Sequence, residues 1–381
     1  GATPGTIGLQ DQNGKMYGMI ASKIMVEGPI KKDTTSYMLS VRRFMYDLIT
    51  RPLTRATSFN GTSVGYNFYD LNAKINHIIS PKDRLYLSFY SGGDKILSRQ
   101  KTQSDLNKMI LKWGNILGSF RWNHLYGDRL FSNLTLYSTR YRLANDFTNT
   151  FTHNSIKEKT SMSYWSGIVD LSLKADFDYY LNQNYKIRLG GTTIFHHFNP
   201  NTTSYKSFEN SAAVDTSFGS IKQNGFENAV YLENEISIGS RLFTNFGLRV
   251  TNYHIPNRNY ASIEPRFLTT YLVGENTLLK ASYSQMNQYI HLLTGSGPNM
   301  QNDIWVPVTD IIKPSLSKQF AFGLERTFRN GEYEVSLEGY HKTMNDLITY
   351  KDGVATLSSA SDWQSQVETN GTGKSYGLEF L

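Results

Sequence analysis

Hydrophobic and polar residues alternate one by one along much of the chain. After Phe68, every second residue is apolar or aromatic and the residues between are polar, as in Tyr69, Asp70, Leu71, Asn72, Ala73, Lys74, Ile75 and Asn76. Successive side chains of a β-strand point to opposite faces, so this alternation predicts strands with one apolar and one polar face. The same pattern recurs at residues 169–178, 242–251, 320–325 and 333–338.

The connections between these segments alternate in length. Short turns rich in Gly, Pro, Asn and Asp lie at 80–83, 126–129, 238–241, 273–276 and 329–332, as tight hairpins require. We expect long polar loops at 46–63, 95–109, 144–160, 198–224, 290–315 and 348–372, with one short exception near 255–258. A soluble sandwich also alternates in polarity but has no reason for this asymmetry, which is typical of antiparallel barrels that cross an outer membrane.

The alternating segments predict about fifteen strands, each near the length that a tilted strand needs to cross a bilayer. Single-chain bacterial barrels usually have an even number of strands. We therefore expect residues 17–381 to form an all-β, antiparallel transmembrane β-barrel that is incomplete at its carboxyl end. Residues 1–16 are then a linker, and the lipid bilayer is the first expected partner.

Composition narrows the class further. The chain has no cysteine. It has 25 Tyr and 21 Phe although only 39% of its residues are hydrophobic, a mixture expected where strands present aromatic residues outward and polar residues inward. The net charge of +7 comes from 39 basic and 32 acidic residues that are interspersed, so no basic helix or dense Lys/Arg run indicates nucleic-acid binding. No run of 18 apolar residues predicts a transmembrane helix.

Candidate chemistry is sparse. Asp176 and Asp178 share one strand face, as do Glu233 and Glu235. Such pairs suit acid–base work or calcium binding, but the nearby inward cations favour a charge-balanced wall. His196 and His197 are adjacent and point to opposite faces, so they cannot bind one metal together. We expect no catalytic residue, no metal and no cofactor, and hence not an enzyme.

Several stretches resemble the TonB-dependent outer-membrane receptors of the Bacteroidetes type. They are KIMVEGPI at 23–30, SYMLSVRR at 36–43, FYDLNAK at 68–74, RLYLSFYSG at 84–92, IEPR at 263–266, NDIWVP at 302–307 and the segment 316–346. The resemblance implies a barrel of about 22 strands around an amino-terminal plug. Residues 1–16 would then be a remnant of the connection between plug and barrel.

The resemblance also implies function and partners. Such a receptor binds a scarce nutrient outside the cell and imports it with energy from the TonB complex, which acts through a plug not present in this chain. A surface lipoprotein covers the barrel in the glycan-uptake relatives. Two alternatives stay open on the residues alone: a passive outer-membrane porin with a water-filled channel, and a surface or assembly barrel that transports nothing.

Ligand contacts are expected in the long connection around residues 289–310, because binding residues concentrate in loops on a rigid scaffold. The candidates are its aromatic and polar residues Tyr289, His291, Asn299, Asn302, Asp303 and Trp305. The alternative for the same residues is packing between loops.

Overall fold

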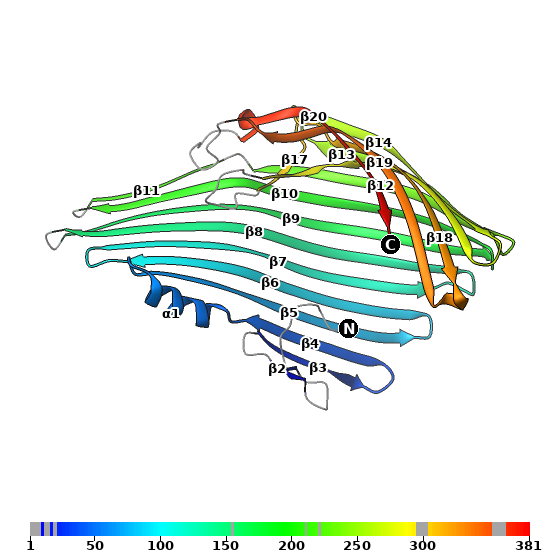
Figure 1. Ribbon diagram of the computed structural model, residues 1–381, viewed down its shortest axis with the longest axis horizontal. Helices are drawn as coiled ribbons and strands as arrows, with labels where there is room; N and C mark the ends of the chain where they lie inside the picture. Colours follow the sequence, from blue (N-terminus) through cyan, green and yellow to red (C-terminus); the bar gives the residue numbers. More distant parts are fainter. Residues whose placement is uncertain are drawn as a thin grey trace.

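A computed structural model describes residues 9–10, 16–17, 21–153, 156–209, 212–219, 222–294, 304–352 and 363–381. In these residues nearly all of the chain is β-strand (Figure 1). The helical elements described are α1 (Asp47–Thr57), η1 (Arg329–Gly331) and η2 (Trp363–Gln366). None of the described helices has the length and apolar character needed to span a membrane.

One antiparallel sheet of 16 strands forms most of the molecule. Fifteen strands pair in one continuous order, and β11 (Ala212–Gly219) pairs only with β10. Their bounds, in chain order, are β3 (Ala21–Lys31), β4 (Thr35–Phe44), β5 (Thr62–Ser80), β6 (Asp83–Lys101), β7 (Asp105–Leu125), β8 (Leu130–His153), β9 (Ile156–Asn182), β10 (Tyr185–Glu209), β12 (Gln223–Ile238), β13 (Leu242–Ile255), β14 (Arg258–Val273), β15 (Thr277–Gln288), β18 (Ser315–Phe328), β19 (Tyr333–Tyr350) and β20 (Val367–Phe380).

The predicted fold class and strand number are therefore confirmed: this is the curved antiparallel sheet of a β-barrel. Strands β3 and β20 are the two ends of the order and do not pair with each other in the described residues. The short strands β1 (Leu9–Gln10) and β2 (Met16–Tyr17) pair only with one another. The assignment of residues 1–16 to a linker stays a prediction, because most of them lie outside the described residues.

The predictions of long loops at 95–109, 144–160 and 198–224 are wrong, because most of these residues are β-strand. There the chain continues as β-strand, so that β9 is 27 residues long and β8 is 24. The register of β6 with β7 runs without interruption from Asp83 to Lys101. The alternation that marks a strand in the sequence exists only where one face meets an apolar medium. Beyond that zone both faces mix polar and apolar residues, as at Ile96 and Leu97, so the alternation fades although the strand continues.

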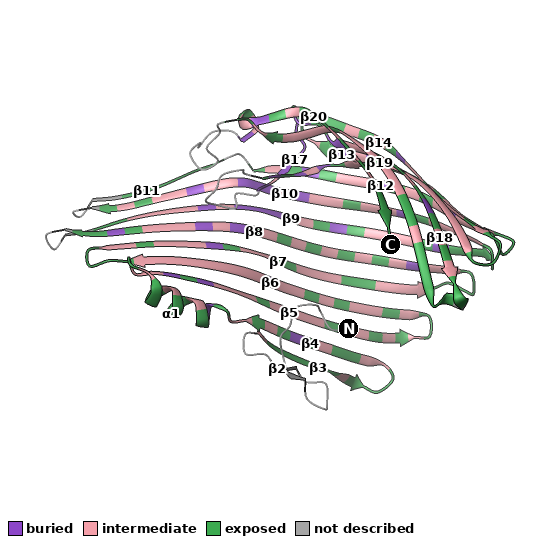
Figure 2. Ribbon diagram, in the orientation of Figure 1, coloured by how far each residue is buried: buried purple, intermediate pink, exposed green. Residues whose placement is uncertain are grey.

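The two faces of the sheet differ as the alternation predicted. Apolar side chains at alternate positions are exposed on one face, for example Leu171 at 51%, Leu248 at 47% and Phe322 at 58%. This exposure alternates along the strands in Figure 2. The short turns at the opposite end from the long strand extensions use left-handed backbone where required, with φ of 61° at Gly239 and 70° at Gly274, a conformation that glycine adopts without steric cost.

Candidate ligand-facing site on the inner wall

The connection between β15 and β18 folds back as a small hairpin of β16 (Ile290–Leu293) and β17 (Ile304–Pro307). Leu293, Ile304 and Val306 of this hairpin are buried in one cluster with Tyr164 of β9 and Trp363. Strand β9 lies far from β19 and β20 in the sheet order, yet Ile348 and Val367 of those strands join the same cluster. These contacts are possible only across the concave face, so the hairpin packs inside the curve of the sheet.

The two faces of the hairpin have different surroundings. His291, Leu293, Ile304 and Val306 point into packed structure, with exposures of 4%, 1%, 3% and 0%. Leu292 and Trp305 lie directly opposite each other in the hairpin register. Leu292 is 39% exposed, and Trp305 is partly exposed. The hairpin therefore presents one aromatic and one aliphatic side chain away from the core that holds it.

Tyr289 and His291 are buried rather than presented to solvent. The Tyr289 ring stacks on Tyr253, with centroids 5.0 Å apart and planes 5° from parallel. Its hydroxyl lies 2.6 Å from the Thr251 hydroxyl oxygen, a hydrogen bond in which either group can donate. His291 Nδ1 lies 3.4 Å from the Ser315 hydroxyl oxygen. Burial lowers the pKa of His291 to about 4, so its ring is neutral at ordinary pH.

Of the six predicted ligand residues, the structure therefore describes three. Trp305 keeps an accessible surface, whereas Tyr289 and His291 attach the hairpin to the wall. Asn299, Asn302 and Asp303 lie outside the described residues. Ligand contact by any of the six stays a prediction.

Beneath the hairpin, the inner wall carries a chain of charged side chains that crosses five strands. His196 Nδ1 lies 2.8 Å from an Asp170 carboxylate oxygen, and its Nε2 lies 3.6 Å from Glu227. Arg249 continues the chain, with its guanidinium 3.2 Å from Glu227 and 4.0 Å from Glu264. The members come from β9, β10, β12, β13 and β14, whose register places them on the same face.

Glu264 links this charge network to the hairpin. Its side chain is 2% exposed, and one carboxylate oxygen accepts a 3.0 Å hydrogen bond from the backbone N–H of Asn287, just before the hairpin. Arg266 lies 3.9 Å from the other oxygen. Two further bonds hold the far side of the connection, since Tyr260 donates to the Thr309 carbonyl at 2.7 Å and Arg258 to the Asp310 carbonyl at 2.8 Å.

The carboxylate pairs found in the sequence are part of a balanced wall, as expected. Arg188 lies 2.7 Å from Asp178, and Lys186 lies 3.3 Å from Glu235. Lys174 lies 3.1 Å from Asp176, which also accepts a hydrogen bond from Tyr231. The described residues contain no group of His, Asp and Glu that could hold a metal ion. His196 and His197 have separate partners, since His197 bonds Asn224 at 2.7 Å.

Comparison with known proteins decides the family. The model of the family described as TonB dependent receptor-like, beta-barrel matches residues 45–381. The chain belongs to this family. A search of curated proteins finds no match.

Solved structures share the receptor-barrel fold at low sequence identity. The RagAB peptide importer in its closed-closed state has a TM-score of 0.62 and 10% identity, over 94% of this chain and 47% of that one. FpvA of P. aeruginosa, bound to a heterologous pyoverdine, has a TM-score of 0.61 and 10% identity, over 94% and 51%. Fiu of E. coli K12, a ferric-catecholate import receptor, has 0.57 and 13%, over 95% and 61%. The chain spans about half the length of the first of these structures.

Sequence reasoning missed most of the inner-wall network of this receptor barrel. Glu264 stood inside the IEPR motif at 263–266, and alternation alone placed it on the polar face. Its partner Arg249, and Glu227 that pairs with Arg249 in turn, lie on other strands. A shift of one residue in the pairing would have separated them, and the sequence does not specify pairing to that accuracy.

Proposed function

We propose that this chain is the barrel portion of an outer-membrane receptor that binds a scarce nutrient and imports it with energy from the TonB complex. The observation that carries the proposal is the hairpin β16–β17 packed inside the curve of a sheet whose inner face is lined with ion pairs. A polar lumen hydrates a solute, and an inward-folded segment places side chains where that solute must pass.

The exposed side of the hairpin is the proposed ligand contact. Trp305 and Leu292 form an apolar pair whose backbone is held by the buried residues on the opposite side. Aromatic side chains on a rigid support contribute large contact area at low conformational cost. We assign Trp305 to ligand contact, and Tyr289 and His291 to support of the hairpin.

The partners follow from the family. The TonB complex would act through a plug domain seated in the lumen, against the charged inner wall. The likeness to the RagAB peptide importer and the sequence stretches noted above favour the Bacteroidetes type, for which a surface lipoprotein lid is a further predicted partner. Co-purification of the protein from native membranes tests the lid.

An uptake experiment tests the function. Cells expressing the complete gene product, in wild-type or Trp305→Ala form, receive radiolabelled ferric catecholate or a labelled peptide mixture, with and without depletion of TonB. We expect one probe to accumulate only when TonB is present, and Trp305→Ala to reduce uptake about ten-fold. Leu278→Ala, a truncation on β15 away from the hairpin, is the matched control.

The two alternatives predict different outcomes. A passive porin would swell proteoliposomes in neutral sugars of graded size at rates independent of TonB. A surface or assembly barrel would accumulate neither probe and would leave the sugars outside. Either result would remove the import proposal.

A further inference from the structure

A band of exposed apolar side chains covers the outer face of the sheet and ends at a definite level. On β9 it runs from Tyr179 through Leu173 and Leu171 to Val169, all more than a third exposed. These ten residue steps rise about 33 Å along the strand, which a tilt of about 40° reduces to about 25 Å, the height of the apolar band of outer-membrane barrels. The strands continue beyond Val169 to Ile156.

Cations collect on the same face just beyond that level. Arg140 of β8 lies directly opposite Val169 in the register, and Arg142 lies opposite Gly167, two residues farther out. On the next strand pair, Lys95 of β6 is directly opposite Lys112 of β7. Like charges placed opposite each other destabilise a sheet unless an anion lies between them.

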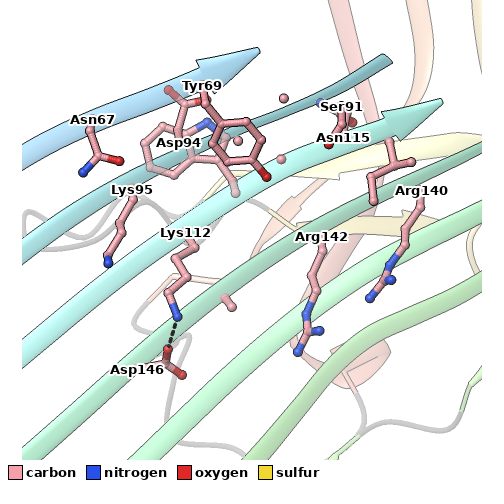
Figure 3. Close-up of a pocket in the computed structure, with 16 residues that line it drawn as sticks. Asn67, Tyr69, Ser91, Asp94, Lys95, Lys112, Asn115, Arg140, Arg142 and Asp146 are labelled. Carbon is pink, nitrogen blue, oxygen red and sulfur yellow. Dashed lines mark hydrogen bonds and ion pairs between the residues drawn. The ribbon is translucent and has the colours of Figure 1, made fainter. Parts of the chain in front are cut away.

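The protein supplies little negative charge for this group. Within the described residues, one of the four cations has a carboxylate partner: Lys112 Nζ lies 3.0 Å from an Asp146 oxygen. Asp94 also borders the cleft, but it accepts a 2.5 Å hydrogen bond from Tyr66. Figure 3 shows the four cationic side chains in a row across neighbouring strands. The group therefore keeps a net positive charge beside an apolar surface.

The four cations line a hollow in the wall rather than a flat surface. The cleft has a volume of about 490 Å³ and its floor includes Gly93 and Gly114, which face each other in the register. A Cβ at Gly114 would lie 2.5 Å from the carbonyl oxygen of Gly92, so the floor admits no side chain there. A second, smaller cleft adjoins it. Arg140 and Arg142 line both clefts, and Trp165 lines the smaller one.

We propose that this outer-face cleft, formed by Lys95, Lys112, Arg140 and Arg142, binds the phosphate groups of an outer-leaflet glycolipid whose acyl chains lie along the apolar band. Arginine recognises phosphate through paired N–H donors, and lysine supplies compact charge. Arg142 is held for this role by Trp165, whose ring centroid is 4.8 Å from the guanidinium carbon. A ligand with both phosphate and acyl chains pairs with the cations of the cleft and covers the apolar band, whereas free phosphate pairs only with the cations.

Binding of lipid A to the complete, detergent-purified protein tests the proposal. Native mass spectrometry measures retention of lipid A, of dephosphorylated lipid A, and of lipid A with inorganic phosphate as competitor. We expect wild-type protein to retain lipid A, and R140Q/R142Q to weaken retention about ten-fold, while R140K/R142K recovers much of it because the charge remains. Higher salt should weaken binding, since these charges are partly screened.

The control removes the same charge elsewhere. Lys82 and Arg129 are exposed in the short turns at the other end of the strands, so K82Q/R129Q should bind lipid A like wild type. Equal loss in both double variants, or equal retention of the dephosphorylated lipid, would overturn the proposal. Complete displacement by inorganic phosphate would assign the cleft to free anions instead. Because the assay measures lipid in detergent, its failure leaves the uptake result unaffected.

Discussion

Glu264 is a fully buried side chain on the inner wall, and its hydrogen bond and ion pairs explain how a carboxyl group is tolerated there. It accepts a backbone N–H from Asn287 and lies between the guanidinium groups of Arg249 and Arg266. A buried charge is tolerated only when it is paired and hydrogen-bonded. The same contacts make Glu264 the residue through which the wall holds the start of the hairpin.

Glu264→Ala should loosen the hairpin without unfolding the sheet. The change leaves the Asn287 N–H without its acceptor and removes one of the two carboxylates beside Arg249, which costs about 2–3 kcal/mol. Hydrogen exchange of the Asn287 and Ile290–Leu293 amides measures it, and we expect them to exchange roughly 30–100-fold faster. Asp215→Ala is the control, since the side chains of Asp215 and its partner Lys206 are 61% and 62% exposed and exposed pairs contribute little. Unchanged exchange in the Glu264 variant would contradict the anchoring role.

A single strand tests the assignment of faces. Phe120 is 42% exposed on the apolar face of β7, opposite Leu87 and Leu136. Ser119, its neighbour in sequence, points to the inner face. Phe120→Arg places a charge near the middle of the band and should cost about 2–4 kcal/mol of insertion free energy, whereas Ser119→Arg should fold. Heat-modifiable electrophoresis of outer membranes gives the folded fraction of each, and similar fractions would refute the assignment.

At the scale of elements, the hairpin β16–β17 depends on a neutral histidine. His291 has its pKa lowered to about 4 by burial, against 6.5 when exposed. Below about pH 6.5, His291 takes up a proton in the undocked hairpin, whereas in the docked hairpin it stays neutral down to about pH 4. The free energy of docking therefore becomes less favourable between about pH 6.5 and pH 4 and is constant below pH 4. The loss amounts to roughly 3 kcal/mol at most.

Hydrogen exchange between pH 7 and pH 4, corrected for intrinsic rates, measures this effect on the backbone amides of Ile304, Trp305 and Val306. We expect protection to decrease as pH falls. His291→Gln should remove the pH dependence, because no group then titrates at that position. A variant with the wild-type pH dependence would place the titrating group elsewhere.

The elements also show what the sequence could and could not predict. Alternation identified the strands of the main sheet wherever one face is apolar, as at Leu171 and Phe322. It failed at 95–109, 144–160 and 198–224, where both faces of the extended strands mix polar and apolar residues. Tyr289 and Trp305 looked alike as loop aromatics in the sequence. Only the packing across the lumen, which joins residues far apart in the chain, makes the first a support and leaves the second accessible.

At the scale of the whole molecule, the strand lengths give the barrel two unlike ends. Short turns such as 126–129 close one end, and the extensions of β8, β9, β10 and β11 project from the other, as Figure 1 shows. Outer-membrane barrels have short turns on the periplasmic side and longer segments outside. The cationic cleft and the hairpin both lie toward the long end, so the extensions should face the cell exterior.

The absence of cysteine makes this orientation directly measurable. Lys206→Cys lies on the extension of β10, where the native side chain is 62% exposed, and Gly127→Cys lies in a short turn with nothing within 4 Å of its added Cβ. A membrane-impermeant maleimide added to intact cells should label the cysteine at 206 and leave that at 127 unlabelled until the outer membrane is permeabilised. The reverse pattern would invert the barrel, and with it the side from which the proposed ligand would reach Trp305. Labelling at both positions in intact cells would mean that the sheet does not separate two compartments at all.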